Sequence, residues 1–408
     1  MRVLLSAFSC EPGKGSEPEV GLQTLLAAAA HHEVWVLTSD TGAPALRRFL
    51  EAHELGPRIH LEPIPFGIGL DDGLHLLTFH RHYDRWQRRA SERALELERH
   101  IGFDVVHHAT MSTIWTRVGV AAVRKPLVWG PVGGGVEPPL GLLSELGLRG
   151  LLDDMLRVSS RRLLARLPAM RRAPRTAAVV FAQNRETARR LHAAGKVAVL
   201  PNATVVELGA IRPAGDRTQD VALVGRIVGW KGGHLALRAL RHVTHPDAIL
   251  RVYGEGPDRA RLQRAARRWN LADRIQFEGW VPRSTLLAHI ARAGVLVHPS
   301  FHDDAPLSVA EALSLGTPVV CLKHGGPAEV VTRWPTSPSR LIVPRGAEAT
   351  ARQIAEAIDE FLYHPHPIRT SPIGAETSFA AALLDGYDQA TRSLPRYRTV
   401  SGHGPAGA

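Results

Sequence analysis

Short apolar runs alternate with helical stretches twice along the chain, and this alternation restricts the fold more than any other feature. Each run has the length of a strand and is apolar almost throughout, as in RVLLSAFS and DVALVGRIV. Such runs joined by helices indicate parallel sheets covered on both faces, which is an α/β fold. The predicted strands span residues 2–9, 32–39, 58–65, 104–110, 126–132 and 178–184 in the first half, and 220–228, 248–256, 274–281, 293–300, 317–323 and 340–346 in the second.

The two sets of strands are separated by PNATVVELGAIRPAGDRTQ, residues 201–219, which is rich in turn formers. We therefore predict an N-terminal domain over residues 1–205 and a C-terminal domain over 206–365. Residues 366–408 are predicted to hold one helix near 378–387 and a disordered polar end, SGHGPAGA. Two doubly wound domains that face each other bring the carboxyl ends of both sheets to one cleft, where such sheets bind ligands.

The length of 408 residues also favours two domains, and 44% hydrophobic with 22% charged residues is ordinary for a soluble protein. The apolar run in MRVLLSAFSCEPGKG is too short for a secretory signal, and no stretch approaches the ~20 apolar residues of a membrane span. Cys10 and Cys321 lie far apart and show no metal-ligand spacing. We expect a reduced, cytoplasmic protein.

The net charge of +11 suits an acidic small molecule, an anionic membrane or a nucleic acid as partner. The densest basic run, RVSSRRLLARLPAMRRAPR at residues 157–175, fits a basic amphipathic helix at the inner membrane face. The alternative is a solvated helix with a buried leucine stripe, broken near Pro168, and this second interpretation is favoured. The interleaved basic and aromatic residues of a single-strand nucleic-acid binder are missing, so we expect no nucleic-acid partner.

A glycine-rich turn with two cations follows the first strand of the second half. In VGRIVGWKGG, Arg226 and Lys231 stand beside Gly225 and further glycines, just before a helix. Arginine supplies a fork of donors, lysine a compact charge, and glycine lets backbone amides approach, so the turn suits a diphosphate. A surface turn with incidental cations is the alternative.

The segment HPSFHDDAPLSVAEAL, residues 298–313, places acidic residues and Pro306 at the start of a helix. The free amides of Leu307 and Ser308 would point out of that helix, towards an anion. Asp303 lies in the preceding loop, and Glu311 lies about one turn into the helix, where it could accept hydrogen bonds from a ribose diol. Alternatively, Asp303 or its neighbour is only the N-cap, and Glu311 only complements the helix dipole.

These segments in their order resemble the retaining glycosyltransferases of family 4, which have the GT-B fold of two Rossmann-like domains. The core of the resemblance runs from Gly225 to Glu329: GR…KGG, YGEGP, F.GWV, HPS, two acids seven residues apart, EAL..GTPVV and GG..E. In the first half, CEPGKGSEPEVG, DVVHH and WGPVGGG are similar to the family's glycine loop, histidine strand end and second cleft loop.

The resemblance implies a role for each matching residue. The donor is a nucleotide-diphosphate sugar, with the diphosphate held by Arg226, Lys231 and the amides of Leu307 and Ser308. The resemblance further implies that Glu311 binds the ribose and that Asp303 faces the sugar hydroxyls. The residues implied beside the base are Gly279, Trp280 and Val281. The glycines implied beside the phosphates are Gly225 in the phosphate turn and, from the N-terminal domain, Gly13 and Gly15.

Two positions depart from the commonest family pattern. Asp303 stands where glutamate is usual and is followed by Asp304, Ala305 and Pro306 in place of Gly-Phe-Gly. The strand that often ends His-x-His reads His107-His108-Ala109 here. Because neighbouring side chains of a strand point to opposite faces, only one of these histidines is expected to face the cleft as a catalytic group.

The resemblance thus implies a hexosyl-type glycosyltransferase that retains anomeric configuration and needs no cofactor. No Asp-x-Asp metal motif stands at a strand end in the first half of the sequence, so we expect that no divalent metal is needed to hold the phosphates. The acceptor is left open between a growing polysaccharide or lipid-linked glycan and a soluble natural product, and glycan assembly is favoured. A GT-B module that binds a nucleotide sugar without turnover is the alternative from another class, and the shorter acid at Asp303 is its support.

Overall fold

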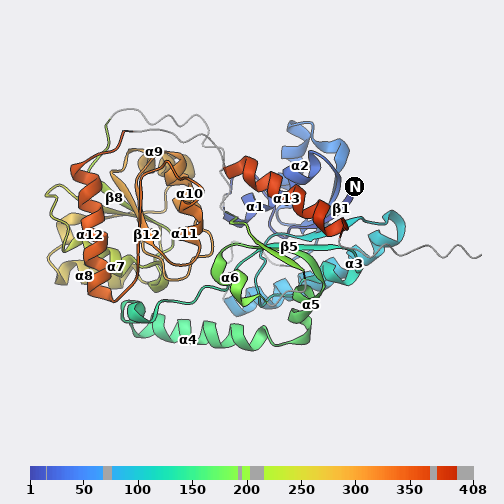
Figure 1. Cartoon of the computed structure of the whole chain (residues 1–408), viewed down its shortest axis with the longest axis horizontal. Helices are drawn as coiled ribbons and strands as arrows, with labels where there is room; N and C mark the ends of the chain where they lie inside the picture. Colours follow the sequence, from blue (N-terminus) through green and yellow to red (C-terminus); the bar gives the residue numbers. More distant parts are fainter. Residues whose placement is uncertain (15, 68–75, 192–194, 203–215, 368–374, 393–408) are drawn as a thin grey trace, which may run out of the picture.

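The computed structural model describes residues 1–14, 16–67, 76–191, 195–202, 216–367 and 375–392. Two doubly wound α/β domains lie side by side and face each other (Figure 1). The predicted α/β class with two parallel sheets is confirmed.

All the strands of the N-terminal sheet are parallel, in the order β3-β2-β1-β4-β5-β6-β7. Side chains on its two faces form separate apolar clusters, as expected for a sheet covered on both sides. The strands are β1 (Arg2–Ser6), β2 (Glu33–Ser39), β3 (Ile59–Ile64), β4 (Val105–His108), β5 (Leu127–Val132), β6 (Ala177–Ala182) and β7 (Lys196–Val199).

The C-terminal sheet is also parallel, in the order β10-β9-β8-β11-β12-β13. In both sheets the strand order reverses beside the first strand, between β1 and β4 and between β8 and β11, and the crevice at such a reversal is where ligands bind. The strands are β8 (Asp220–Val224), β9 (Ile249–Tyr253), β10 (Ile275–Gly279), β11 (Val295–His298), β12 (Val319–Leu322) and β13 (Ser339–Ile342).

Helices cover both faces of each sheet (Figure 1). Those of the N-terminal domain are α1 (Ser16–Ala29), α2 (Ala43–Ala52), α3 (Leu76–Ile101), α5 (Pro168–Thr176) and α6 (Arg185–Arg190). Those of the C-terminal domain are α7 (Gly233–Leu240), α8 (Arg259–Arg268), α9 (Arg283–Arg292), α10 (Leu307–Ser314), α11 (Gly326–Val331) and α12 (Ala347–Tyr363). Short 3-10 turns lie at η1 (Gly56–Arg58), η2 (Gly119–Val123), η4 (Gly229–Lys231) and η5 (Ala272–Arg274).

Two elements do not pack on the domain that the chain has just built, but on the other domain. The turn η3 (Leu140–Leu146) follows β5 of the N-terminal sheet, yet Leu142 and Leu146 are buried in the core of the C-terminal domain. Helix α13 (Ala375–Arg392) follows the C-terminal domain, yet it packs on α1 and β6, and Tyr387 is buried in the N-terminal core. The two domains are therefore joined by several crossings of the chain.

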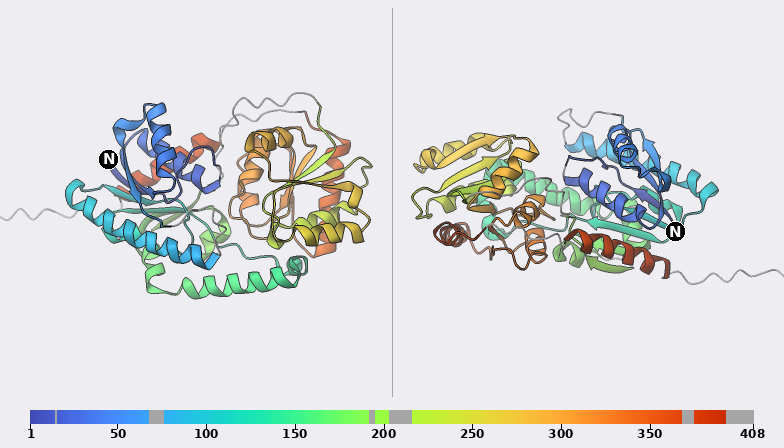
Figure 2. Two further views of the ribbon diagram at one scale, coloured as in Figure 1. Left: turned by 180° about the vertical axis from the view of Figure 1, so that it is seen from behind. Right: turned by 90° about the horizontal axis from the view of Figure 1, so that it is seen from above.

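Helix α4 (Gly147–Leu164) connects η3 to the N-terminal domain and runs beneath both domains in Figure 1 and in the left view of Figure 2. The predicted break near Pro168 is confirmed, because α4 ends at Leu164 and α5 begins at Pro168. The predicted buried leucine stripe is wrong. Leu163 on α4 is 64% exposed, and Arg157 and Arg161 of the same helix point towards the space between the domains. Leu167, just before α5, is 43% exposed and borders that same space.

Candidate functional site

A cavity of about 1410 Å³ lies between the two domains and is lined by residues of both. Its C-terminal wall comes from the loops after β8 and β11 and from the start of α10. Its N-terminal wall comes from α3 and from the loops after β4 and β5, and α4 closes one side. The cavity therefore occupies the place where the carboxyl ends of both parallel sheets meet.

Lys231 and Asp303 form the polar centre of the C-terminal wall. Lys231 Nζ donates to Asp303 Oδ2 over 2.5 Å, and His298 Nε2 lies 2.9 Å from the same oxygen. Burial by itself would raise the pKa of Asp303, but the charge of Lys231 and the contact with His298 hold that pKa well below its usual range. Asp303 is therefore an ionised carboxylate whose position is set by two neighbours.

The start of α10 points into the same cavity, where Leu307 and Ser308 both line the wall. Pro306 precedes the helix with an extended backbone, and no side chain caps the helix. The first N–H groups of a helix lack partners within the helix, and the dipole makes this end attractive to anions. Gly326 supports the loop from α11: its N–H donates to Asp303 O over 2.8 Å, and a Cβ on Gly326 would lie 1.8 Å from Asp304 O.

Glu311 lies on α10 outside the cavity lining. Its Oε1 is 2.5 Å from Nη1 of Arg283, the first residue of α9, and the glutamate side chain is only 5% exposed. Burial raises the pKa of Glu311, and the charge and hydrogen bond of Arg283 oppose that rise. Arg283 was not predicted as a site residue, although it follows the predicted base segment in the sequence by two positions.

The remaining predicted donor residues are spread around the carboxyl edge of the sheets. Gly225 lines the cavity with a φ of +135°, a backbone conformation that favours glycine. Arg226 is exposed and lies outside the lining. Outside the lining also are Gly13, Gly279, Trp280 and Val281, while Gly15 lies outside the described residues.

His107 and His108 are both fully buried in β4 and away from the cavity lining. His107 contacts the hydroxyl of Tyr387 on α13 at 2.8 Å and the carbonyl of Gly130 at 2.7 Å. His108 points to the opposite face, with Nδ1 3.1 Å from Ser6 Oγ. Burial lowers the pKa of His107 to about 4 and that of His108 to about 3. The expectation that one of the two histidines faces the cleft is corrected, because both side chains are buried inside the N-terminal domain.

Asp304 connects the two domains across the cavity. One carboxylate oxygen accepts the N–H of Gly134 over 2.8 Å, and the other accepts from Asn184 Nδ2 over 3.1 Å. Burial raises the pKa of Asp304, opposed by the Gly134 hydrogen bond. The sequence marked Asp304 only as a departure from the family pattern, and it marked Gly134 within WGPVGGG, but it gave no sign that they meet.

Several cavity residues were missed by the sequence interpretation. Arg157 and Arg161 reach the cavity from α4, where Arg157 lies 5.2 Å from the ring centre of Trp230 and Arg161 lies 4.0 Å from that of Trp115. Glu17 of α1 lines the N-terminal wall and accepts the N–H of Met111 over 2.8 Å. Glu17 belongs to the predicted glycine loop and could have been found there, whereas nothing in the sequence told which face of α4 points inward.

Within the described ranges no group of three or more histidine, cysteine, aspartate or glutamate residues is arranged to hold a metal ion. Over the same part of the chain no helix combines the length and apolarity needed to cross a bilayer.

Residues 210–369 match the model of the family described as glycosyl transferases group 1. The chain is 32% identical over 197 residues to 2-deoxystreptamine N-acetyl-D-glucosaminyltransferase of Streptomyces fradiae, covering 46% of this chain and 44% of the relative. It is 32% identical over 197 residues to GDP-mannose-dependent alpha-(1-6)-phosphatidylinositol monomannoside mannosyltransferase of Mycolicibacterium smegmatis, covering 46% and 49%. The chain thus spans about half the length of the curated relatives it matches.

The fold is similar to that of HepE from Anabaena, solved in complex with UDP and glucose. The TM-score is 0.54 at 18% identity, and the match covers 94% of this chain and 100% of HepE. Together with the two facing parallel sheets, this similarity confirms the GT-B fold.

Proposed function

We propose that the protein is a retaining, metal-independent glycosyltransferase that moves a hexosyl group from a nucleotide-diphosphate sugar to a hydroxyl acceptor. The observation that carries this proposal is the cluster of Lys231, Asp303 and the α10 N-terminus in the cavity between the two domains. The cluster lies within the residues that match the group 1 glycosyl transferases.

The donor is proposed to lie along the C-terminal wall. Lys231 and the amides of Leu307 and Ser308 receive the diphosphate, and Arg226 at the exposed rim adds a second cation. Glu311 binds the ribose hydroxyls, oriented by Arg283, and residues 279–281 lie beside the base. The complex of HepE with UDP and glucose supports this class of donor.

In the proposed reaction the bond between the anomeric carbon and the diphosphate oxygen breaks, and the acceptor hydroxyl forms the new bond on the same face. The hydroxyl proton passes to the leaving diphosphate. Lys231, Arg226 and the helix amides stabilise the charge that develops on the diphosphate, so a divalent metal is not required for that role. Asp303, held ionised, faces the oxocarbenium-like sugar. His107 and His108, predicted as catalytic, support the wall from within the core.

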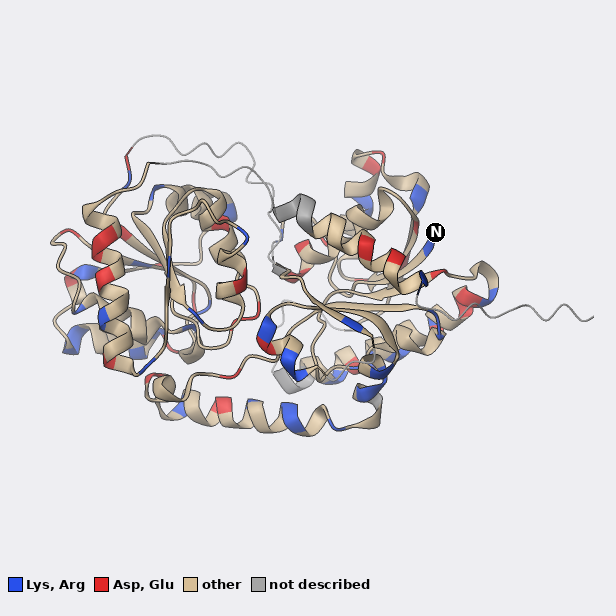
Figure 3. Ribbon diagram, viewed as in Figure 1, with Lys and Arg blue, Asp and Glu red and all other residues tan. Residues whose placement is uncertain are grey.

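A growing polysaccharide or a lipid-linked glycan at the inner membrane face is the proposed acceptor. Helix α4 exposes an apolar ridge of Leu148, Leu152 and Leu156, with 78%, 53% and 70% of each residue exposed. Figure 3 shows basic residues along α4 and α5, and in the sequence all of them are arginines. Apolar side chains flanked by cations suit an anionic bilayer surface. The buried free thiols of Cys10 and Cys321 suit a reducing, cytoplasmic location.

A soluble natural product is the second candidate acceptor. The 2-deoxystreptamine N-acetyl-D-glucosaminyltransferase matches the chain over as many residues as the mannosyltransferase does, at the same identity. An acceptor of that kind would not need the apolar ridge on α4.

A donor screen tests the proposal. The full chain is incubated with UDP-, GDP- and TDP-sugars in excess chelator, and mass spectrometry follows both transfer and donor hydrolysis. The proposal predicts turnover of one nucleotide sugar without added metal. Tight nucleotide binding by calorimetry without turnover of any donor would instead identify a non-catalytic module, and turnover that appears only after metal is restored would contradict metal independence.

A further inference from the structure

The wall of the cavity opposite the donor residues is strongly basic. It carries His80, Arg81, Arg85, Arg88 and Arg117 from α3 and the loop after β4, and α4 adds Arg161 to the lining of the same cavity. Two carboxylates also line this wall, and both already have partners. Arg88 Nε and Arg117 Nε lie 3.0 and 2.8 Å from the two oxygens of Asp84, and Glu17 accepts the N–H of Met111.

Among the cations of this wall, Arg161 has the geometry best suited to bind an anion. Its guanidinium lies 4.0 Å from the ring centre of Trp115, and Trp115 is only 8% exposed. No carboxylate lies within ion-pair distance of Arg161 in the part of the chain that the structure describes. A guanidinium stacked by its face keeps its N–H donors free at the edge, in the geometry that suits a phosphate or carboxylate.

The surroundings keep Arg161 charged but poorly solvated. Burial, followed by the charge of Arg157, lowers the pKa of Arg161 to about 10, and the charges of Asp304 and Asp154 oppose this shift, so Arg161 stays protonated at neutral pH. Burial and then the charge of Arg161 lower the pKa of His80. A partly buried cation among other cations is unfavourable on its own, and an incoming anion would relieve both the desolvation and the repulsion.

The position of Arg161 assigns the anion to the acceptor and not to the donor. Arg157, one turn earlier on α4, contacts the donor wall, with Nη1 3.3 Å from His302 Nε2 and its charge near Trp230. Arg161 instead stacks on Trp115 of the N-terminal wall. The two arginines therefore face opposite walls of one cavity.

We propose that Arg161, with Arg81 and Arg85, forms an anion subsite that binds a phosphate or carboxylate group of the acceptor. This inference rests on the proposed function. It favours an anionic glycan or a phosphate-linked lipid, and it disfavours a free diamine such as 2-deoxystreptamine, whose ammonium groups the basic wall would repel.

The test compares neutral, anionic and cationic acceptors. Octyl glucoside, octyl glucoside 6-phosphate and octyl glucuronide share one glycoside skeleton, and 2-deoxystreptamine is the cationic acceptor. Each is offered with the donor found in the screen, and kcat/KM is measured for each. We expect the phosphate or the carboxylate to exceed octyl glucoside by about tenfold or more, and the two anionic arms distinguish which group is bound. Equal use of charged and neutral acceptors, or preference for the diamine, would overturn the proposal.

Two variants are compared. Arg161→Gln removes the proposed ligand of the anion, and Arg267→Gln is the matched control, because Arg267 is an exposed arginine on α8. Arg161→Gln should lower the ratio of kcat/KM for anionic over neutral acceptor about tenfold, Arg161→Lys should restore part of it, and Arg267→Gln should leave it unchanged. A rise in donor KM with an unchanged acceptor ratio would assign Arg161 to the donor and overturn the subsite. Failure of the proposed function looks different, because no donor would then be turned over at all.

Discussion

At the scale of single residues, Asp303 is a cavity residue whose side chain is held by two neighbours. Its carboxylate is shared between Lys231 at 2.5 Å and His298 at 2.9 Å, and the shorter side chain of aspartate fits between them. The family resemblance marked Asp303 as a departure because glutamate is usual there. The contacts with Lys231 and His298 give a physical reason for an acid at this position.

Asp303→Asn should lower the free energy of unfolding by about 1–3 kcal/mol at pH 7, because it removes a charged acceptor from two neighbours. The folded-state pKa of Asp303 lies below its ordinary value, so this stabilisation is present above the unfolded pKa of about 3.9 and is lost as the pH falls below it. Urea unfolding of both proteins between pH 7 and pH 2 measures the difference, which should shrink on acidification.

Asp247→Asn, at an exposed aspartate, is the control and should change stability by less than about 0.5 kcal/mol across the range. A difference for Asp303→Asn that stays constant down to pH 2 would show that the carboxylate is not held ionised by its neighbours.

Residue types at the ends of strands could be predicted from the sequence, but the direction of their side chains could not. The alternation of a strand puts His107 and His108 on opposite faces, and the structure shows this. What the sequence does not contain is that α13 returns to cover one face, so that Tyr387 meets His107. That contact joins residues 280 positions apart.

At the scale of elements, the predicted strands agree closely with the structure, because a near-continuous apolar run bounded by turn formers is a strong local signal. β3, predicted at 58–65, spans Ile59–Ile64, and β12, predicted at 317–323, spans Val319–Leu322. β7 was missed, since KVAV is short and follows a polar stretch. Turn η3 could not be assigned to the C-terminal domain, because its leucines would suit either core.

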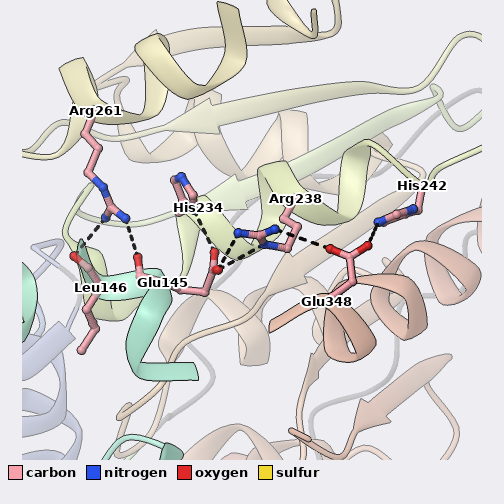
Figure 4. Close-up of polar contacts among 7 residues, drawn as sticks. All are labelled: Glu145, Leu146, His234, Arg238, His242, Arg261 and Glu348. Carbon is pink, nitrogen blue, oxygen red and sulfur yellow. Dashed lines mark hydrogen bonds and ion pairs between the residues drawn. The ribbon is translucent and has the colours of Figure 1, made fainter. Parts of the chain in front are cut away.

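The anchor of η3 on the C-terminal domain depends on Glu145 (Figure 4). Its carboxylate lies 2.8 Å from His234 Nδ1 and accepts from Arg238 Nη2 over 2.9 Å, both on α7, and Arg261 donates to its backbone carbonyl over 2.8 Å. We expect Glu145→Gln to lower the free energy of unfolding by about 1.5–3 kcal/mol, because a buried ionic acceptor is lost. Denaturant titration measures the change.

Glu51→Gln on α2, at an exposed glutamate, is the matched control and should have almost no effect. If the two variants were equally stable, η3 would be held by Leu142, Leu146 and the backbone contacts of Arg261, without help from the Glu145 carboxylate.

The apolar ridge of α4 leads to a second prediction at the scale of elements. Leu148→Ser with Leu156→Ser should reduce binding to vesicles of phosphatidylcholine and phosphatidylglycerol by about tenfold or more, since each leucine loses its burial in the bilayer. Binding should also weaken with salt, because the flanking arginines contribute electrostatically. Co-sedimentation measures both effects.

Leu55→Ser with Leu95→Ser is the control pair, at exposed leucines of the N-terminal domain away from α4. Equal sedimentation of the two double variants would contradict membrane contact through α4. A dimer in light scattering that only the α4 variant abolishes would assign the ridge to a second copy of the chain.

At the scale of the whole molecule, the two sheets and α4 place the proposed donor residues and the proposed anion subsite on facing walls of one cavity. The sequence predicted the facing sheets, because each half repeats the same alternation of strands and helices. It did not predict that α4 spans both domains or that Asp304 hydrogen-bonds to the N-terminal domain. Those features depend on how the halves dock, and docking is decided by long-range contacts such as Asp304 with Gly134.

The most direct test of the central claim is the rate of sugar transfer from the accepted nucleotide sugar after removal of Lys231. The account predicts that Lys231→Ala lowers kcat/KM about 100-fold or more, because the diphosphate loses its cation in the cavity, and that Arg226→Ala is also strongly impaired. Lys196→Ala, at an exposed lysine on β7, should stay within about twofold of the unmodified protein. Near-normal transfer by both Lys231→Ala and Arg226→Ala would contradict the assignment of the diphosphate site.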